Sequence, residues 1–206
     1  MIQAVVFDFG GVFSKGDRAR ARLADFDALL GWPTGTMLYR LFSGEAWELA
    51  STGKISPEEH WARTAGDVES RLPADFGRFK GDPFYLEDID QEVVTLAVRL
   101  RERCRLALCS NALPGLADHL EAMPEFRALF EEIVISALVG LRKPDAQIFE
   151  LTARKLGLPI SDCLLVDDKE RNALAAEAAG MSAVVFRSAE QLEASLDSLL
   201  QGGWHT

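Results

Sequence analysis

Five short apolar runs, separated by stretches of helical spacing, constrain the fold of this chain more than any other feature of its sequence. The runs are Ala4 to Phe7, Arg105 to Cys109, Ile133 to Ile135, Cys163 to Val166 and Ala183 to Phe186. Apolar residues between the runs recur at helical spacing, as at Val93, Leu96 and Leu100. Short buried strands that alternate with helices indicate a parallel sheet covered on both faces. We therefore predict an α/β fold with a doubly wound, Rossmann-like parallel sheet.

The stretch between the first and second runs breaks this alternation, because it contains no convincing strand and has the pattern of several helices. Leu29 belongs to an apolar stripe within residues 23–30, and Ser56 is placed to cap a later helix. We predict a small α-helical cap domain inserted after the first strand. The predicted domains are a Rossmann-like catalytic core over residues 1–13 and 86–206 and a helical cap over residues 14–85.

Charge and cysteine content exclude several classes of protein. The net charge of −10 argues against a nucleic-acid partner, because neutralising the phosphates of a duplex requires a surface rich in lysine and arginine. An anionic substrate must then be bound by a few well-placed cations. The cysteines, Cys104, Cys109 and Cys163, lie in or beside strand-like runs, where free thiols pack as small hydrophobic residues. We expect neither a disulfide framework nor a zinc site.

The apolar runs also bear on location. The N-terminus shows no basic region, extended apolar stretch or cleavage site, and no later apolar run is long enough to span a bilayer. We therefore expect a cytoplasmic protein with no membrane partner. Its oligomeric state stays open between a monomer and a homodimer.

Polar residues and glycines gather where the predicted strands end. Ligands bind at the carboxyl ends of the strands in a parallel sheet with helical crossovers, so these positions form the candidate site. They are Asp8, Phe9, Gly10 and Gly11 after the first strand, Ser110 and Asn111 after the second, Lys143 several residues after the third, and Asp167 and Asp168 after the fourth. Each alone has an ordinary structural explanation, such as a turn or a helix cap. Their joint order and placement indicate a functional site.

Segments of this chain resemble the four ordered motifs of the haloacid dehalogenase-like superfamily: FDFGGV, LALCSN, GLRKPD and LLVDDKERN. The resemblance spans nearly the whole chain. The helical insertion is similar to the cap of that superfamily's members, and residues 51–61, STGKISPEEHW, look like a cap segment of the same subfamily. The resemblance implies a metal-dependent hydrolase, in the first place a phosphatase acting on a small phosphorylated metabolite.

The resemblance also implies a role for each residue at the strand ends. Asp8 attacks phosphorus to give an aspartyl phosphate, and because two anions repel each other, this step needs a divalent cation and a fixed ammonium group. The implied cation is Mg²⁺, held by Asp8, the carbonyl oxygen of Gly10 and Asp168, with Asp167 orienting a water on the metal. The implied phosphate contacts are Ser110, the backbone amides of Phe9, Gly10 and Asn111, and Lys143, which also bridges to Asp8. Asn172 is implied nearby.

One position departs from the usual pattern of the superfamily's phosphatases, which carry a second aspartate two residues after the nucleophile. That aspartate protonates the departing alcohol and then activates water. Here the position is Gly10, which has a carbonyl oxygen to offer a metal but no proton to donate. Loss of general acid catalysis typically costs about 10²- to 10⁴-fold in rate. The sequence leaves open whether Gly10 is present for a backbone with positive φ.

Three interpretations of Gly10 stay open. We expect a phosphatase whose substrate has a good leaving group, such as a sugar 1-phosphate, or whose acid comes from elsewhere; Asp17, Glu45 and His60 of the cap are candidates. A 2-haloacid dehalogenase needs no acid, because halide leaves unprotonated, but it also needs no metal, and the second acidic pair would repel an anionic haloacid. The third interpretation is a non-catalytic, phosphate-binding member of the fold.

Overall fold

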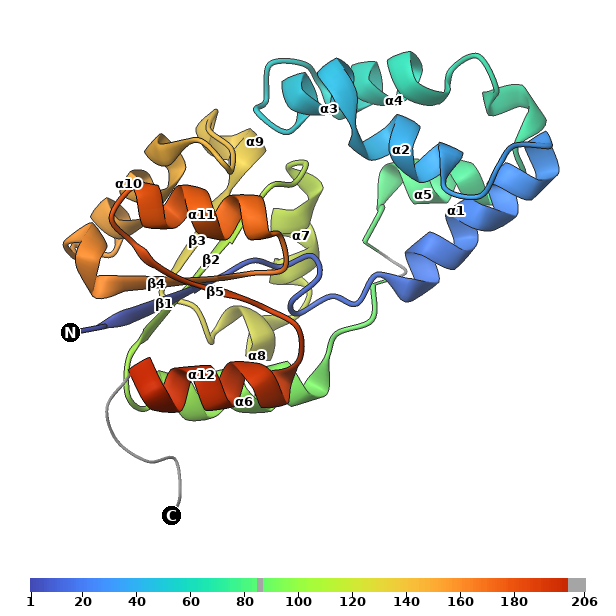
Figure 1. Cartoon of the computed structure of the whole chain (residues 1–206). Coiled ribbons are helices and arrows are strands. Elements are labelled where there is room, and N and C mark those ends of the chain that lie inside the picture. Colours follow the sequence, from blue (N-terminus) through green and yellow to red (C-terminus); the bar gives the residue numbers. More distant parts are fainter. Residues whose placement is uncertain (85–86, 200–206) are drawn as a thin grey trace.

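A parallel sheet of five strands forms the centre of the molecule (Figure 1). The computed structural model describes residues 1–84 and 87–199 of the chain. The strands are β1 (Ala4–Phe7), β2 (Arg105–Ser110), β3 (Glu132–Ile135), β4 (Cys163–Asp167) and β5 (Ser182–Val185), in the order β3-β2-β1-β4-β5. Neighbouring strands are parallel, which confirms the predicted sheet. Ser110 and Asp167 end their strands instead of following them, because β2 and β4 are longer than predicted.

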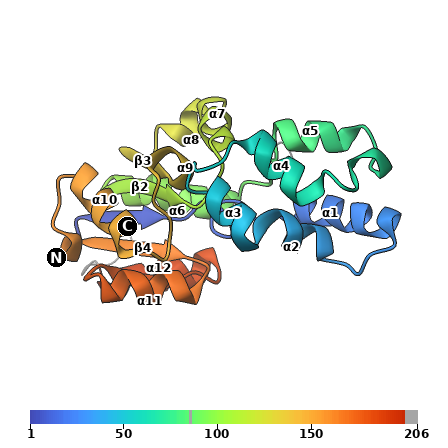
Figure 2. The same ribbon diagram turned by 90° about the horizontal axis from the view of Figure 1, so that it is seen from above.

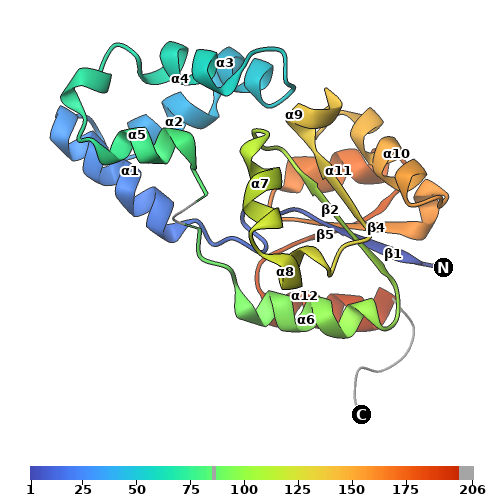
Figure 3. The same ribbon diagram turned by 180° about the vertical axis from the view of Figure 1, so that it is seen from behind.

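Side chains that alternate along the strands build a core on each face of the sheet. Val5 and Phe7 of β1 contribute to one core, and Ala4 and Val6 to the other. The first face is covered by α6 (Gln91–Arg101), α7 (Gly115–Glu121), α8 (Pro124–Arg127) and α12 (Ala189–Leu199), and the second by α10 (Ala146–Lys155) and α11 (Glu170–Ala178). The short elements α9 (Ser136–Val139) and η2 (Ile160–Asp162) lie on either side of α10 in the chain. Figure 3 shows the two helical layers from behind.

A separate group of helices forms the predicted cap, beside the carboxyl ends of the strands (Figure 2). Its elements are α1 (Asp17–Leu30), α2 (Thr36–Phe42), α3 (Gly44–Ala50), α4 (Pro57–Ala65), η1 (Glu69–Arg71) and α5 (Asp75–Gly81). The Ser56 hydroxyl accepts a hydrogen bond from the Glu59 N–H at 3.2 Å, which confirms the predicted cap of α4. Leu29 is 62% exposed, so the predicted apolar stripe of α1 is wrong at this position, because α1 turns only Leu23, Phe26 and Leu30 into the cap core.

The two segments that join the cap to the sheet are hydrogen-bonded to each other. The Lys15 N–H donates to the Asp88 carbonyl at 3.1 Å, and the Asp90 N–H donates to the Phe13 carbonyl at 2.7 Å. These bonds hold the segment that returns from the cap against the loop that follows β1. The predicted domain boundary between residues 85 and 86 lies outside the described residues.

The cysteine thiols pack as small hydrophobic residues. All are free; Cys109 and Cys163 are buried, and Cys104 is half-buried. Burial raises the pKa of each of these thiols to about 11, so they stay protonated at neutral pH. Over residues 1–84 and 87–199, no helix combines the length and the apolar character needed to cross a membrane.

Candidate active site

The order of the strands brings the predicted site residues together. β1 is paired in register with β2 on one side and β4 on the other, so the residues at the three strand ends are neighbours. Asp8 directly follows β1, while Ser110 and Asp167 end β2 and β4. Lys143 reaches the same point from the loop between α9 and α10. All four side chains are buried.

Lys143 is the centre of the buried site. Its Nζ lies 3.0 Å from Asp8 Oδ1 and 2.6 Å from Asp167 Oδ2. Burial alone would lower the pKa of the Lys143 ammonium, but the charges of Asp8 and Asp167 outweigh it and raise that pKa. Asn111 fixes the backbone of Lys143, because its side chain donates to the Lys143 carbonyl at 2.7 Å and accepts from the Lys143 N–H at 2.8 Å. Lys143 is therefore a fixed positive charge.

Asp167 anchors this ammonium. Its carboxylate also accepts hydrogen bonds from Asn172 Nδ2 at 2.9 and 3.0 Å and from the Lys169 N–H at 2.9 Å. Burial raises the pKa of Asp167, but Lys143 and these hydrogen bonds outweigh it and hold that pKa below its ordinary value. Both oxygens of Asp167 are thus engaged by the protein, and Asn172 lies where the family resemblance implies.

Asp8 is ordered by two contacts on the same oxygen. Oδ1 accepts from the Phe9 N–H at 2.7 Å and lies against Lys143. The Phe9 amide, expected to hold a phosphate oxygen, donates to Asp8 here. Burial raises the pKa of Asp8, Lys143 opposes this rise, and the neighbouring Asp167 adds to it. A further positive charge beside Asp8 would favour its ionised form.

The acidic residues at the strand ends fit a metal ion. Asp8, Asp167 and Asp168 each offer an oxygen, and these oxygens lie within 4.8 Å of one another. Asp168 Oδ1 is buried and accepts no hydrogen bond from the described residues. A buried carboxylate oxygen without a partner in the protein needs an ion or a water to complete its surroundings. Because Mg²⁺ prefers oxygen ligands, the donor set suits this ion.

The two glycines after Asp8 differ in what their backbone requires. Gly11 has a φ of +81°, where side chains are rarely found, and a Cβ there would lie 2.5 Å from Asp168 Cγ. Gly10 lies outside that region of φ, and a Cβ there would meet no heavy atom within 4 Å apart from its chain neighbours, among the described residues. The close approach of Asp168 therefore requires glycine at position 11, whereas Gly10 has room for a side chain.

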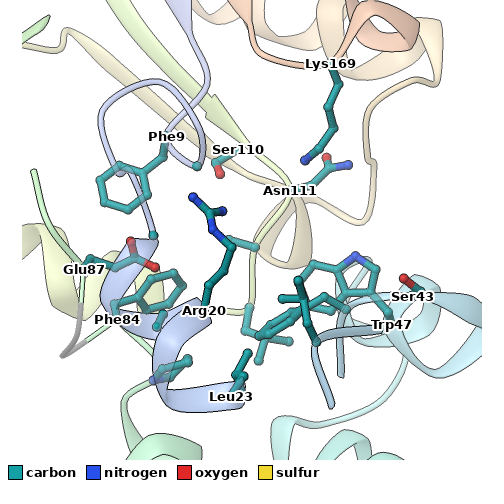
Figure 4. Close-up of a pocket in the computed structure, with 18 of the residues that line it drawn as sticks. Phe9, Arg20, Leu23, Ser43, Trp47, Phe84, Glu87, Ser110, Asn111 and Lys169 are labelled. Carbon is teal, nitrogen blue, oxygen red and sulfur yellow. The ribbon is translucent and has the colours of Figure 1, made fainter. Parts of the chain in front are cut away.

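A cavity of about 420 Å³ lies between the cap and the strand ends (Figure 4). Most of its wall is apolar, and its larger apolar side chains include Leu23, Leu38, Phe42, Trp47, Phe79 and Phe84. Its cations are Arg20, Arg142, Lys169 and Arg171. The cavity thus combines an apolar body with the few local cations that an acidic chain needs in order to bind an anion.

The apolar cavity opens onto the site at the strand ends. An adjoining hollow of about 490 Å³ is lined by Asp8, Lys143 and Asp168. The residues that line both spaces include Gly10, Arg20, Glu87, Ser110 and Lys169. In Figure 4 the polar ends of Arg20, Ser110 and Lys169 point into a common central space. In a bound molecule with an apolar part and an anionic part, the bond between the two parts would lie in this common space.

Arg20 and Glu87 line both spaces of the candidate site, and the sequence did not predict either of them. One feature of the sequence could have pointed to Glu87: it stands in the short segment that returns the chain from the cap past the strand ends. The predicted acid candidates of the cap lie elsewhere. Asp17 and Glu45 are exposed, and His60 is wholly buried inside the cap. None of these three lines either space within the described part of the chain.

A parallel sheet whose strand ends carry a lysine-bridged acidic site beneath a helical cap defines a class of capped hydrolases. The chain belongs to the haloacid dehalogenase-like hydrolases, because the model of that family matches residues 2–180. The superfamily predicted from the four motifs is thereby confirmed.

Relatives of comparable length include phosphatases. Sesquiterpene phosphatase of Aspergillus oryzae is 27% identical over 87% of this chain and 87% of its own. D-ribitol-5-phosphate phosphatase of Bacteroides thetaiotaomicron is 25% identical over 84% of this chain and 85% of its own. A haloacid dehalogenase family enzyme from the same bacterium, crystallised with magnesium and inorganic phosphate, has a TM-score of 0.69 at 18% identity, covering 91% of this chain and 95% of that one. The last likeness supports the fold.

Proposed function

We propose that this protein is a Mg²⁺-dependent phosphatase that hydrolyses a phosphoester through an aspartyl phosphate on Asp8. The observation that carries the proposal is the buried Lys143 ammonium, 3.0 Å from Asp8 and 2.6 Å from Asp167. A carboxylate nucleophile must approach an anionic phosphate, and a fixed ammonium beside it reduces their repulsion. The phosphatase relatives support the same class of reaction.

Asp8 would be the nucleophile. One of its oxygens forms a bond to phosphorus while the bond from phosphorus to the alcohol oxygen breaks, and the alcohol leaves with a proton. Water then attacks phosphorus in the aspartyl phosphate, which releases inorganic phosphate and restores the Asp8 carboxylate. Ser110 and the amides of Gly10 and Asn111 would hold the phosphate oxygens, and Lys143 would bridge them to Asp8.

The metal would be held by Asp8, Asp168 and the carbonyl oxygen of Gly10. Bound there, Mg²⁺ would offset the negative charge of the phosphate and of the carboxylates. The unpaired, buried Asp168 Oδ1 supports this assignment. Asp167 would act through Lys143, because both of its oxygens already accept hydrogen bonds from the protein.

The cavity wall favours a substrate whose alcohol part is apolar. Sugar hydroxyls need hydrogen-bond partners when they are buried, and a wall of leucine and aromatic side chains offers few. This favours an apolar phosphoester over the sugar 1-phosphate suggested by the leaving-group argument. Of the two named relatives, the sesquiterpene phosphatase is of the apolar kind, and the D-ribitol-5-phosphate phosphatase is not.

A dehalogenase is the second candidate, and Gly10 favours it because halide leaves without a proton. The same site contains Asp168, whose unpaired charge would repel a haloacid unless a metal were bound. The phosphatase therefore accounts for more of the site.

The test is a screen of the full chain for phosphate release from three substrates: 4-nitrophenyl phosphate, decyl phosphate and glucose 1-phosphate. The same screen measures halide release from 2-chloropropionate. We expect phosphate release that requires Mg²⁺ and falls below about a hundredth in Asp8→Asn, with the unfolding transition retained. A higher residual rate would show that Asp8 is not the nucleophile. Halide release would favour the dehalogenase, and no Asp8-dependent turnover would favour a phosphate-binding module.

The metal assignment has a separate readout. Mg²⁺ should raise the midpoint of thermal unfolding of the wild-type chain, because a ligand that binds only the folded state stabilises it. Asp168→Ala should abolish this rise, while the exposed Asp118→Ala should retain it. An equal rise in wild type and Asp168→Ala would contradict the assignment.

A further inference from the structure

Hydrolysis of an apolar phosphoester needs a proton for the departing alcohol, and the strand ends do not supply it. Gly10 occupies the position of the usual acid and has no side chain. Protonation of a poor leaving group is worth about 10²- to 10⁴-fold in rate. Among the described residues, no heavy atom other than those of its chain neighbours lies within 4 Å of a Cβ built at Gly10, so there is open space beside Gly10, which lines the same hollow as Asp8. A carboxyl group from another segment has room to serve it.

Glu87 reaches this space from the segment that returns the chain from α5 to the sheet. It lines both the apolar cavity and the hollow that contains Asp8, as do Gly10 and Ser110. It therefore stands where the alcohol part of a phosphoester would join its phosphate. Its N–H donates to the Phe84 carbonyl at 2.9 Å, which orders its backbone. Figure 4 shows its carboxyl group turned toward Arg20 and the interior of the cavity.

The carboxyl group of Glu87 is held in a state suited to giving and taking a proton. Its Oε2 is buried and accepts no hydrogen bond from the described residues. Burial raises the pKa of Glu87 to about 7, the neighbouring Arg20 opposes this rise, and Asp88 adds to it. Lys169 is the other charged side chain that lines both spaces. At neutral pH both the protonated and the ionised forms of Glu87 are therefore populated.

We infer that Glu87 is the general acid of this enzyme and replaces the carboxyl group that is missing at Gly10. This inference rests on the proposed function. As an Asp8 oxygen bonds to phosphorus, the bond from phosphorus to the alcohol oxygen breaks, and the proton of Glu87 passes to that oxygen. The Glu87 carboxylate then accepts a proton from the water that attacks the aspartyl phosphate. Both carboxyl groups thereby return to their starting states.

The other titratable side chains described as lining both spaces are Arg20 and Lys169. Guanidinium and ammonium groups are much weaker acids than a carboxyl group, and they serve better as donors of hydrogen bonds to phosphate oxygens. Arg20 and Lys169 are thus suited to binding the phosphate, and Glu87 to transferring the proton.

The experiment compares substrates that differ in their need for an acid. Decyl phosphate leaves as a poor alkoxide unless it is protonated, whereas 4-nitrophenolate leaves without a proton. For Glu87→Gln we expect kcat/KM to fall about 100-fold for decyl phosphate and to change less than about 3-fold for 4-nitrophenyl phosphate. Glu125→Gln, an exposed glutamate of α8, is the matched control and should leave both values unchanged.

Two further readouts separate proton transfer from a structural role. In the wild type, kcat/KM for decyl phosphate should fall as pH rises through about 7, because the protonated form of Glu87 is the active one in phosphoryl transfer to Asp8, and Glu87→Gln should lack this fall. Gly10→Asp should restore turnover of decyl phosphate by Glu87→Gln at least about 10-fold, because it returns a carboxyl group to the open space.

The outcomes separate this inference from the proposed function. Equal losses on both substrates in Glu87→Gln would show that the residue only orders the cavity, and no loss on either would show that it has no role; each overturns the inference. If 4-nitrophenyl phosphate is hydrolysed in an Asp8-dependent way, the proposed function stands in both cases. Without such hydrolysis, the proposed function fails, and the role of Glu87 as acid fails with it.

Discussion

The site at the strand ends and the cavity under the cap adjoin each other, yet they are held together in opposite ways. At the strand ends buried polar groups hold one another, since Lys143 bridges Asp8 and Asp167 while Asn111 holds Lys143. The cavity wall is mostly apolar side chains from several cap helices. Polar bonds with fixed directions suit chemistry that tolerates little displacement, whereas apolar packing suits recognition that depends on shape.

The strongest way to break the strand-end site is to remove its ammonium. Lys143→Met leaves Asp8 and Asp167 buried without a counter-charge, so we expect a loss of about 3–5 kcal/mol in the free energy of unfolding, together with loss of turnover. Urea denaturation would measure the first effect. Lys155→Met is the control, because its ion pair with Glu132 lies at the surface and is worth about 0–1 kcal/mol.

The pH dependence of the same variant sharpens this prediction. Without Lys143 the buried carboxylates of the folded state hold protons more tightly than those of the unfolded chain. The folded state then binds more protons, so the stability of Lys143→Met relative to wild type should fall as pH rises from acidic to neutral. A deficit that is independent of pH would contradict the charge-based explanation.

A smaller effect is expected from the two glycines after Asp8. Gly11→Ala should cost about 1–3 kcal/mol, because it forces a side chain into a positive φ and against Asp168. Gly10→Ala should be neutral or stabilise by up to about 1 kcal/mol, because the position is open and has an ordinary φ. Equal stabilities in chemical denaturation would show that the two positions do not differ in this way.

The smallest effect is expected in the cavity. Phe42→Ala should lower kcat/KM for decyl phosphate about 10-fold while changing that for ethyl phosphate much less, because only the longer chain reaches the apolar wall. Leu29→Ala on α1 is the control, because that side chain is 62% exposed and does not line the described cavity. Equal losses for both phosphates would show that Phe42 supports the fold and not substrate choice.

Sequence reasoning was effective at the strand ends because the physics there is simple. Parallel strands end at one edge of the sheet, so Asp8, Ser110 and Asp167 had to converge once their strands were identified. The sequence did not predict which cap side chains line the cavity, because their orientation depends on how several short helices pack together. Leu29 fits the apolar stripe of α1 and is exposed, whereas Glu87 stands in an irregular segment with no period to locate it.

The hydrogen bond between Lys15 and Asp88, at 3.1 Å, closes the cap at its base. An insertion whose two ends meet can be exchanged as a unit without stretching the fold that carries it. Glu87 stands at that base, outside the helices of the cap. Exchange of residues 17–81 would therefore replace much of the apolar wall and keep the inferred acid in the hollow that Asp8 lines. A lineage of such enzymes could then change the alcohol part of its substrate while it keeps the same reaction.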